Sequence, residues 1–510
     1  MRVVVVGAGV AGLAAAHALR GRAQVTVVEA TDRVGGKLRT TPFEGLELEE
    51  GAESFLVRVP DAVRLARHVG LGHDIVHPAT TSASLLISGR LRPLPPRTLL
   101  GVPTDVVGLL RSRVLSPTGL VRAAADLVLP RTPLPADPTV GGFVGARVGR
   151  QVVERLVDPL LGGVYAGRAD AMSLRATVPQ LTPIMSESRS LLLGAYRVRA
   201  RTAPADPATT PVFASVRGGL GRFAAAVADA SEAEILLGTR VRRLSQTAAG
   251  WRLSLVGSGS GSGSGPRAVP DGTSGDTGTS SGPGADAGPA AGPGADLGAD
   301  LEANAVDGPG AWDVDADAVI LAVPVPEARR LLSPVAPHVA APLAAVPYTS
   351  VALITLLYRG VQLPPGSGYL VPPRQGNVMK AATFLSAKWP HLSADPGLSI
   401  VRASVGRAGD ESDLERSDVE LAGVVAAELA AATGLTARPL ASRVTRWDAG
   451  LPQYLPGHLE RTAVVRGMLP AGLALAGAGY DGVGIAACVR SGEAAAETVL
   501  RSDDAVRIGQ

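Results

Sequence analysis

The start of the chain carries the pattern that most constrains how these 510 residues fold. Residues 2–6 (RVVVV) predict a buried β-strand, because a continuous β-branched run suits a parallel strand covered on both faces. A GxGxxG motif follows at 7–12, a helix is expected over about 10–20, and 24–29 (QVTVVE) predicts a second strand. These elements together predict a βαβ unit.

Each glycine of this motif has its own physical task. Gly7 allows a tight turn, Gly9 lets the backbone approach a pyrophosphate, and Gly12 lets the helix pack closely on the sheet. The helix N-terminus supplies unpaired N–H groups to the phosphates, and Glu29, at the end of the second strand, is placed to accept hydrogen bonds from ribose hydroxyls. The motif therefore predicts a dinucleotide site and leaves NAD and FAD open. Its other expected contacts are Ala8, Val10, Ala11 and Ala30.

The rest of the chain predicts further layers. Residues 92–204 alternate proline-punctuated turns with helical stretches and indicate a mainly helical insertion. Strands of a meander are expected at 239–244, 251–256 and 316–323. A second sheet is expected to include 351–357 and 398–405, with a helix at 419–433 and a final strand, glycine turn and helix at 473–476 and 483–500.

One tract distorts the overall composition. Residues 257–310 hold 16 of the 62 glycines and no aromatic residue, and they carry one arginine against seven acidic side chains. Such a tract buries too little apolar surface to offset its ordering entropy, so a disordered loop at a hairpin tip is expected. Because the whole chain has a net charge of +3, the remainder carries about +9, which favours an acidic substrate.

Several function classes are excluded by what the chain lacks. Aromatic residues make up 3% of it, so stacking platforms for nucleic acid are scarce. Cys488 is the only cysteine, which excludes an internal disulfide and favours a reducing, cytoplasmic location. The seven histidines have no ligand spacing, so no metal site is expected. No apolar run is long enough to predict a spanning helix.

Two further segments favour FAD. Residues 33–37 (RVGGK) resemble the extended signature of the glutathione-reductase-2 class of flavoproteins, in which the glycine pair and a basic residue lie along the diphosphate. Arg33, Gly35, Gly36 and Lys37 are therefore expected to bind the cofactor, although the two cations could also be solvated surface charges. Gly51 and Ala52 stand where this class brings a loop to the flavin.

The carboxyl-terminal segment predicts a second contact with the flavin. Residues 475–485 lead from a strand into a glycine-rich helix start, where free amides would stabilise negative charge on the reduced flavin. The expected contacts are Gly477, Val483, Gly484 and Ile485. Because these residues lie far from the first motif, the cofactor domain must be discontinuous.

More specific motifs extend over the chain outside 257–310. Because of these motifs the sequence resembles the protoporphyrinogen oxidase family, and more closely its bacterial branch, the coproporphyrinogen III oxidases. The motifs are GAESF (51–55), LLISGRLRPLPP (85–96), LLGGVYAGRADAMSLRATVPQL (160–181), RGGLGRF (217–223), RWDAGLPQYLPGH (446–458) and GYDGVGIAACVRSGEAAA (479–496).

This resemblance implies an α/β fold: a Rossmann-like FAD-binding domain of the glutathione-reductase-2 or amine-oxidase-like class, a mixed β-sheet substrate domain and a helical insertion. The expected FAD domain comprises 1–55, 211–256, 311–330 and 440–510, and the substrate domain 56–91 and 331–439, with the insertion at 92–210 and the loop at 257–310.

The resemblance also implies an activity: oxygen-dependent, six-electron oxidation of coproporphyrinogen III to coproporphyrin III in haem biosynthesis, with hydrogen peroxide formed. Alternatives are protoporphyrinogen IX as substrate, another flavin amine oxidase or desaturase, and a non-catalytic FAD- or porphyrin-binding protein. The implied partners are the porphyrinogen, O2 and a ferrochelatase receiving the product in a transient hand-over, with no nucleic acid and at most peripheral membrane contact.

Residue roles follow from the same resemblance. Arg446 and Trp447 would pack near the flavin, and Val241 would contact adenine through its backbone. Gly167 would line the substrate pocket. Glu53 is the catalytic candidate, since an acid there could accept a pyrrole N–H or stabilise developing iminium charge; the alternative is a surface or supporting carboxylate.

Substrate carboxylates need cations, and the planar, bidentate guanidinium of arginine suits them. Arg58 is the first candidate, with Arg168 and Arg90 behind it. Many eukaryotic relatives carry an arginine just before the strand corresponding to 85–88, but Ala83 and Ser84 stand there in this chain. The resemblance therefore leaves open which residues bind the substrate carboxylates.

Overall fold

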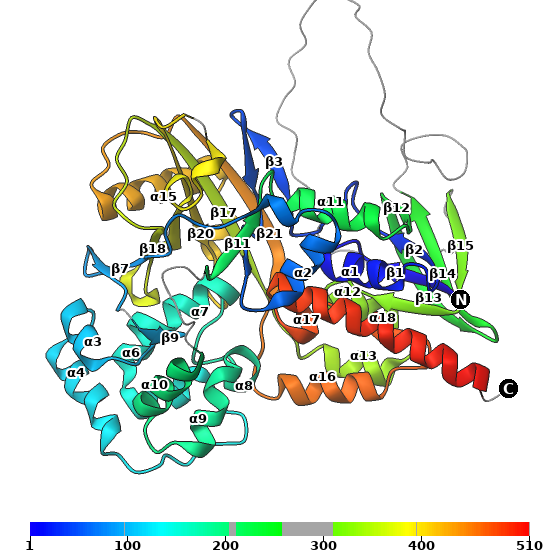
Figure 1. Ribbon diagram of the computed structural model, residues 1–510, viewed down its shortest axis with the longest axis horizontal. Helices are drawn as coiled ribbons and strands as arrows, with labels where there is room; N and C mark the ends of the chain where they lie inside the picture. The colour runs from blue at the N-terminus through cyan, green and yellow to red at the C-terminus, as the bar shows by residue number, and fades with distance from the viewer. Residues whose placement is uncertain (96, 203–210, 258–309, 394, 509–510) are drawn as a thin grey trace, which may run out of the picture.

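The computed structural model describes residues 1–95, 97–202, 211–257, 310–393 and 395–508. The tract predicted as a disordered loop therefore lies almost entirely outside the described residues. Figure 1 shows two sheet-based regions side by side and a group of helices beneath one of them, with the two termini at the same end of the molecule.

The N-terminal valine run forms the central strand of a parallel sheet. The sheet has five strands in the order β12, β2, β1, β16, β22. Their bounds are β12 Glu234–Leu236, β2 Gln24–Val28, β1 Arg2–Val6, β16 Ala318–Leu321 and β22 Leu473–Leu475. The predicted β1, β2 and the helix α1 (Val10–Leu19) are confirmed.

Both faces of this sheet are covered, which is why β1 is continuously apolar. Val3 and Val5 pack against α1 and three further helices, whereas Val4 and Val6 face the meander and its helices. The three further helices on the face of Val3 and Val5 are α2 Pro60–His68, α11 Leu220–Ala230 and α18 Ile485–Ile508. On the opposite face the meander consists of β13 Thr239–Thr247, β14 Gly250–Gly257 and β15 Ala311–Ala316. Its helices are α12 Val325–Leu332, α13 Pro337–Leu343 and α16 His458–Gly467.

The second sheet is mixed and has seven strands in the order β21, β17, β20, β19, β18, β7, β8. Only the β18–β7 pair is parallel. The bounds are β21 Ala441–Pro452, β17 Tyr348–Arg359, β20 Leu398–Val405, β19 Met379–Phe384, β18 Gly368–Leu370, β7 Ser84–Ile87 and β8 Arg90–Pro93. The helix α15 (Asp418–Thr433) packs on it through Leu421, Val425 and Leu429.

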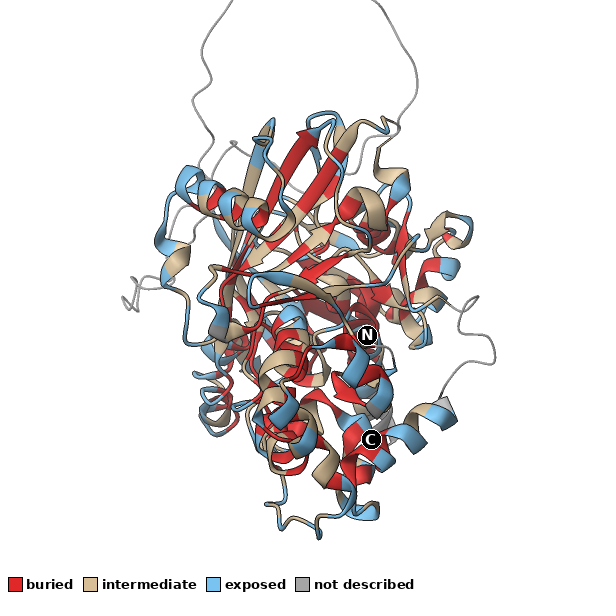
Figure 2. Cartoon of the chain, turned by 90° about the vertical axis from the view of Figure 1, so that its left-hand side faces the viewer, coloured by how far each residue is buried: buried red, intermediate tan, exposed pale blue. Residues whose placement is uncertain are grey.

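A helical region with its own core lies below this sheet (Figure 1). Its helices are α3 Val106–Ser112, α4 Pro117–Ala124, α5 Val140–Val148, α6 Arg150–Val152, α7 Asp158–Tyr165, α8 Leu174–Thr177, α9 Thr182–Glu187 and α10 Leu191–Thr202. Figure 2 shows the buried residues gathered in the sheets and on the inward faces of the helices.

Short elements connect these regions. Two hairpins, a three-stranded sheet and two short helices stand outside the main layers. They are β3 Thr40–Phe43 with β4 Leu46–Glu49, β9 Thr98–Leu99 with β10 Val102–Pro103, β5 Phe55–Leu56 with β11 Phe213–Val216 and β6 Ile75–Val76, α14 Leu385–Lys388 and α17 Ala478–Asp481.

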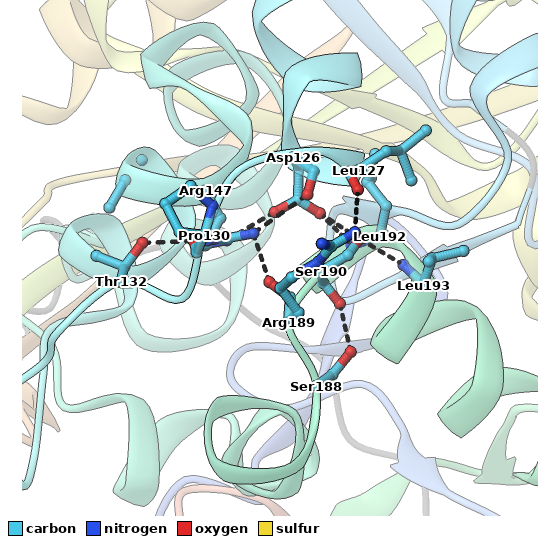
Figure 3. Close-up of polar contacts among 12 residues, drawn as sticks. Asp126, Leu127, Pro130, Thr132, Arg147, Ser188, Arg189, Ser190, Leu192 and Leu193 are labelled. Carbon is cyan, nitrogen blue, oxygen red and sulfur yellow. Dashed lines mark hydrogen bonds and ion pairs between the residues drawn. The ribbon is translucent and has the colours of Figure 1, made fainter.

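A buried ion pair organises the helical region (Figure 3). Arg147 of α5 donates from Nε to Asp126 Oδ1 over 2.7 Å, and both side chains are almost fully buried. Asp126 Oδ2 accepts from Ser190 Oγ and from the Leu192 backbone N–H. Arg147 also donates to the carbonyl oxygens of Pro130 and Arg189. The pair thereby joins the segment after α4 to the start of α10.

The structure corrects the predicted meander. Its third strand is β15 at 311–316, whereas 318–321 within the predicted strand 316–323 is β16, which pairs in parallel with β1. The two strands are separated by one residue, and the polar, mostly exposed β15 differs from the buried, wholly apolar β16. The prediction merged the end of the first strand with the second.

Three domain boundaries also differ from the expectation. The helix α2, expected in the substrate domain, packs through Ala62, Leu65 and Ala66 in the core around α1 and α18. The helix α13 likewise packs in the core beneath the meander. Conversely β21, expected in the FAD domain, pairs along most of its length with β17 of the seven-stranded sheet. The local sequence shows that a helix face or a strand is apolar but not which partner it packs against. Segments close to the points where the chain passes from one domain to the other are therefore assigned to the wrong domain.

Candidate functional site

The GxGxxG turn joins β1 to α1 and shows which glycines serve packing. A Cβ at Gly12 would overlap the Gly7 carbonyl oxygen, and a Cβ at Gly7, whose φ is +99°, would lie 2.8 Å from the Ala322 carbonyl oxygen. A Cβ at Gly9 would meet nothing within 4 Å. Gly9 therefore faces open space at the N-terminus of α1, where a pyrophosphate can approach the backbone.

The second glycine pair packs on the first. The Gly35 N–H donates to the Ala8 carbonyl oxygen over 2.8 Å, and a Cβ at Gly36 would lie 3.2 Å from the Gly9 Cα. Arg33 donates to the carbonyl oxygens of Gly36 and Val34, so its described contacts hold its own turn together. The predicted diphosphate contact of Arg33 stays a prediction.

Lys37 lies deep in the molecule, yet its side chain is accessible to solvent. Desolvation by the surrounding protein lowers its pKa. A residue with both properties faces an internal concave space rather than the outer surface. Lys37 therefore fits a cation that lies along a bound diphosphate better than it fits a solvated surface charge.

Glu29 is fixed at the carboxyl end of β2. Its carboxylate accepts from the Ala8 N–H over 2.8 Å and from the Thr31 N–H over 2.9 Å. The Glu29 carbonyl oxygen accepts from the Thr239 N–H, which brings the start of β13, and with it buried Val241, to this side of the sheet. Arg330 Nη2 donates to the Val241 carbonyl oxygen over 2.6 Å. Ala30, next to Glu29, is exposed.

The carboxyl-terminal segment reaches the same region from the other end of the chain. Gly477 and Gly482 have φ values of +118° and +127°, and a Cβ at Gly484 would meet nothing within 4 Å. The Gly477 N–H donates to buried Ser491 Oγ, which fixes the turn against α18. Val483 is half-buried and Ile485 buried.

Cys488 connects this segment to the N-terminal motif. Burial raises the pKa of the Cys488 thiol to about 12, and the nearby charge of Lys37 acts in the opposite direction. The start of α18 therefore lies near Lys37, which is the proximity required if two distant segments bind one FAD.

Trp447 adds the seven-stranded sheet to this site. Its indole Nε1 donates to the Glu50 carbonyl oxygen over 2.7 Å, and a Cβ at Gly51 would lie 3.4 Å from its ring and would overlap the Lys37 carbonyl oxygen. The Ala52 N–H donates to that same carbonyl oxygen of Lys37. Trp447, the Gly51 loop and Lys37 thus form one packed unit.

Arg446 does not lie beside Trp447 as expected. Successive side chains of a strand point to opposite faces of the sheet. Arg446 forms an ion pair with Asp418 at the start of α15 and donates to the carbonyl oxygens of Leu414 and Arg416. The expectation that both residues pack near the flavin was wrong, because the alternation within β21 separates them.

Glu53 is buried between two cations that sequence reasoning missed. It forms ion pairs with Lys388 of α14 and Arg402 of β20, and all three side chains are at most 13% exposed. Burial by itself raises the pKa of Glu53, but the charges of Arg402 and Lys388 outweigh it and hold the pKa below its ordinary value. Glu53 is therefore an ionised acceptor. Lys388 could have been noticed, because it is one of three lysines in the chain.

Arg402 ties this triad to the loop expected at the flavin. Its Nη1 donates to the carbonyl oxygens of Glu49 and Gly51 over 3.2 and 3.3 Å. Glu53 thus lies close to the Gly51 loop and Trp447, at the junction of the two sheets. This position suits an electrostatic role near the cofactor.

Glu49, beside the triad, gives a pH-dependent prediction. Burial raises its pKa to about 7 although Leu220 N–H and Thr40 Oγ1 donate to it. Since the folded protein holds this proton more tightly than the unfolded chain, the contribution of Glu49 to the free energy of unfolding falls as pH rises from about 4.5 to about 7. A Glu49→Gln variant should lack this fall, so its stability relative to the native protein should increase across that window.

Chemical unfolding at several pH values measures the effect. Glu232→Gln, which removes a well-exposed carboxylate, is the control and should produce no such trend. A constant stability difference between Glu49→Gln and the native protein from pH 4.5 to 7 would contradict the raised pKa.

The structure brings together only part of the predicted substrate set. Gly167 is buried, and a Cβ there would overlap Met172 Sδ and lie 2.5 Å from Gln453 Oε1. Arg168, next to it, donates to the Ala408 carbonyl oxygen and lies 3.6 Å from Asp410. Arg58 is exposed just before α2, and Arg90 is exposed in the edge strand β8. Among the described residues, no hydrogen bond or ion pair joins either of these arginines to Gly167 or Arg168.

Two searches of the described residues bear on other classes of site. No group of three or more His, Cys, Asp or Glu side chains is arranged to hold a metal ion in this part of the chain. None of the helices described is both long and apolar enough to cross a membrane.

The site residues fit FAD. Gly9 and Gly484 leave open space at two helix N-termini, and Lys37 faces the concave region between them. When bound, the dinucleotide would be held by the turns at 7–12 and 35–37, by Glu29 and by the start of α18. Trp447 and the Gly51 loop would complete the contacts from the other sheet.

Comparisons with known proteins agree with this geometry. The family model of flavin containing amine oxidoreductases matches residues 10–264 and 300–500. The chain is 35% identical to coproporphyrinogen III oxidase of Mycobacterium leprae (strain TN) over 97% of both chains. It is 29% identical to protoporphyrinogen oxidase of Homo sapiens, over 98% of both.

A solved structure supports the same assignment. A crystal structure from Exiguobacterium sp. 255-15, assigned to protoporphyrinogen oxidase, matches 98% of both chains with a TM-score of 0.78 and 29% identity. The predicted fold class and the predicted cofactor are thereby confirmed. The chain is an FAD-dependent enzyme and belongs to the flavin containing amine oxidoreductase family.

Proposed function

We propose that the protein catalyses the six-electron oxidation of coproporphyrinogen III to coproporphyrin III in haem biosynthesis, with O2 as the electron acceptor and hydrogen peroxide as the second product. The observation that carries this proposal is the full-length similarity to a coproporphyrinogen III oxidase, together with an FAD cradle in which both ends of the chain take part. The net positive charge outside 257–310 supports a substrate with four carboxylates.

The protein's own residues would bind, orient and stabilise charge. The chemistry that FAD supplies when bound is acceptance of hydride equivalents from the reduced macrocycle. Glu53 is kept ionised in a desolvated setting by Arg402 and Lys388. Its carboxylate can accept a hydrogen bond from a pyrrole N–H and thereby orient the macrocycle. Little further acid–base machinery is required, because pyrrole protons exchange with water.

Protoporphyrinogen IX is the second candidate substrate, because the human relative and the Exiguobacterium structure are both named as protoporphyrinogen oxidases. It has two propionates instead of four, so the basic character of the chain favours it less. Delivery of the porphyrin to a ferrochelatase, a cytoplasmic location and at most peripheral membrane contact belong to the same proposal.

Aerobic incubation with each porphyrinogen tests the function. We expect porphyrin fluorescence to grow fastest with coproporphyrinogen III, and three molecules of hydrogen peroxide to form per porphyrin, because six electrons leave in three two-electron steps. Protein stripped of FAD is the control and should be inactive until FAD is restored. If FAD-loaded protein produces no fluorescence with either substrate, the proposal is wrong.

A further inference from the structure

One of the chain's three lysines has no role in the site described above. Lys37 faces the cofactor space and Lys388 pairs with Glu53, whereas Lys380 of β19 is 4% exposed and forms no ion pair with a described residue. Its ammonium donates to the Gly406 carbonyl oxygen over 2.6 Å. Because all but three of the 49 lysines and arginines are arginines, a lysine at such a buried position needs a physical explanation.

A β-bulge aims this lysine inward. The register between β19 and β20 shifts between Met379 and Ala381, which pair with Val405 and Ser404, so Lys380 is the extra residue. A bulge re-aims a side chain that regular pairing would place differently, and bulges are frequent beside active sites. Desolvation, and then the nearby charge of Arg407, lower the pKa of Lys380 to about 7.

Arg407 is the second buried cation, at 7% exposure. Its Nη2 donates to the Val371 carbonyl oxygen over 2.6 Å, but its buried Nη1 finds no hydrogen-bond partner among the described residues. That Nη1 lies 2.6 Å from where a Cβ would stand at Gly162 of α7, so the glycine allows the guanidinium to approach the helix. An orphaned guanidinium N–H in the interior is costly and indicates a missing acceptor.

The neighbouring carboxylates act on the two cations through their charges but form no ion pair with them in the described part of the chain. Asp158 accepts from the Ala169 N–H, Glu411 from the Ser350 N–H, and Asp410 lies near Arg168. Two neighbouring buried cations that bond only to carbonyl oxygens, with no ion-pair partner among the described residues, destabilise the fold unless an anionic ligand joins them.

The two residues that flank Arg407 in the chain contact the flavin side and the predicted substrate side. A Cβ at Gly406 would lie 3.2 Å from the Val351 Cα, and Val351 pairs with Trp447. On the other side the Ala408 N–H donates to the Ala166 carbonyl oxygen, next to Gly167. Arg168, 40% exposed, extends the line of cations toward solvent. An anionic group bound here would be held within reach of the junction between the sheets.

We propose that Lys380 and Arg407 together bind a propionate carboxylate of the porphyrinogen and thereby position the macrocycle. The inference rests on the proposed function and deepens it. An ammonium and a guanidinium converging on one carboxylate supply charge-assisted hydrogen bonds, and Arg407 Nη1 gains the acceptor that it lacks.

The test uses FAD-loaded protein and two stable porphyrins. Lys380→Met and Arg407→Leu should each weaken binding of coproporphyrin III roughly ten- to hundredfold, the value of one charge-assisted hydrogen bond, in a fluorescence titration. Binding of coproporphyrin III tetramethyl ester, which has no carboxylate, should be unchanged. With coproporphyrinogen III, KM should rise much more than kcat falls.

Two further variants guard against a merely structural effect. Arg359→Gln removes an exposed cation at the end of β17 in the same sheet and should change neither affinity. Where Lys380→Met or Arg407→Leu fails to retain FAD, Lys380→Arg and Arg407→Lys keep the charge and should bind the free acid more than tenfold more tightly than the ester.

Equal affinity of the native protein and the charge-removing variants for coproporphyrin III overturns the assignment, as does an equal loss with the ester. Either result leaves the proposed function standing if the native protein still oxidises coproporphyrinogen III. Native holoenzyme that neither oxidises a porphyrinogen nor binds a porphyrin overturns the proposed function as well.

Discussion

A Gly9→Leu variant is expected to fold and to lose its FAD. A Cβ at Gly9 meets no protein atom within 4 Å, and its φ of −68° suits any residue, so the leucine costs the apoprotein little. The same side chain would occupy the space through which the backbone at the start of α1 approaches a pyrophosphate. We expect at least a hundredfold weaker FAD binding, equivalent to about 2.7 kcal/mol.

Flavin absorbance of the purified protein, circular dichroism and the shift in Tm on adding FAD measure this effect. The native apoprotein should be stabilised by added FAD, and Gly9→Leu should not. Gly423→Leu is the matched control, because Gly423 lies exposed in α15 and a Cβ there also meets nothing within 4 Å. Gly12→Ala, by contrast, should impair folding itself, since its Cβ would overlap the Gly7 carbonyl oxygen. A Gly9→Leu protein purified with full flavin content would show that the cofactor does not approach this turn.

The second large effect is expected in the helical region, where Asp126→Ala should destabilise the protein by about 3–5 kcal/mol. The substitution leaves the buried Arg147 charge without its carboxylate and removes the acceptor of Ser190 Oγ and the Leu192 N–H. The cost arises because these groups stay buried without their acceptor. The double variant Asp126→Leu, Arg147→Met should therefore lose less free energy of unfolding than Asp126→Ala alone.

Urea unfolding followed by circular dichroism measures both variants. The control is Arg150→Gln, which breaks an ion pair with Asp170 in the same region. Both side chains of that pair are about half exposed, so its loss should cost at most about 1 kcal/mol. If Asp126→Ala and Arg150→Gln destabilise the protein equally, the buried network does not hold the helical region together.

The cofactor half of the site was predictable because its signal is local. One βαβ unit contains β1, the glycines at 7–12 and Glu29, and each of these positions has a defined role in binding a dinucleotide. The two glycine segments at 35–36 and 482–484 were also found, since close backbone approach demands glycine wherever it occurs. Gly7, Gly12 and Gly482 indeed have neighbours that exclude a side chain.

The substrate half was not predictable in the same way. Glu53 was singled out, but its partners lie more than 300 residues away along the chain, Lys388 in the helix α14 and Arg402 in the strand β20. Arg446 was misplaced because its neighbour in sequence, Trp447, points to the opposite face of β21. Lys380 and Arg407 carry no motif that distinguishes them from the other basic residues of the chain.

The sequence by itself determined the dinucleotide fold, the discontinuous use of both chain ends and the choice of FAD, because backbone approach to a phosphate requires particular residues at fixed local spacing. Only the tertiary structure decided how the seven strands of the second sheet are ordered, which cations are buried with no ion pair to a described residue, and which carboxylate stays ionised. Those properties depend on burial and on charges brought together from distant segments. Desolvation and long-range pairing arise from the packed molecule as a whole, and no local pattern of residues records them.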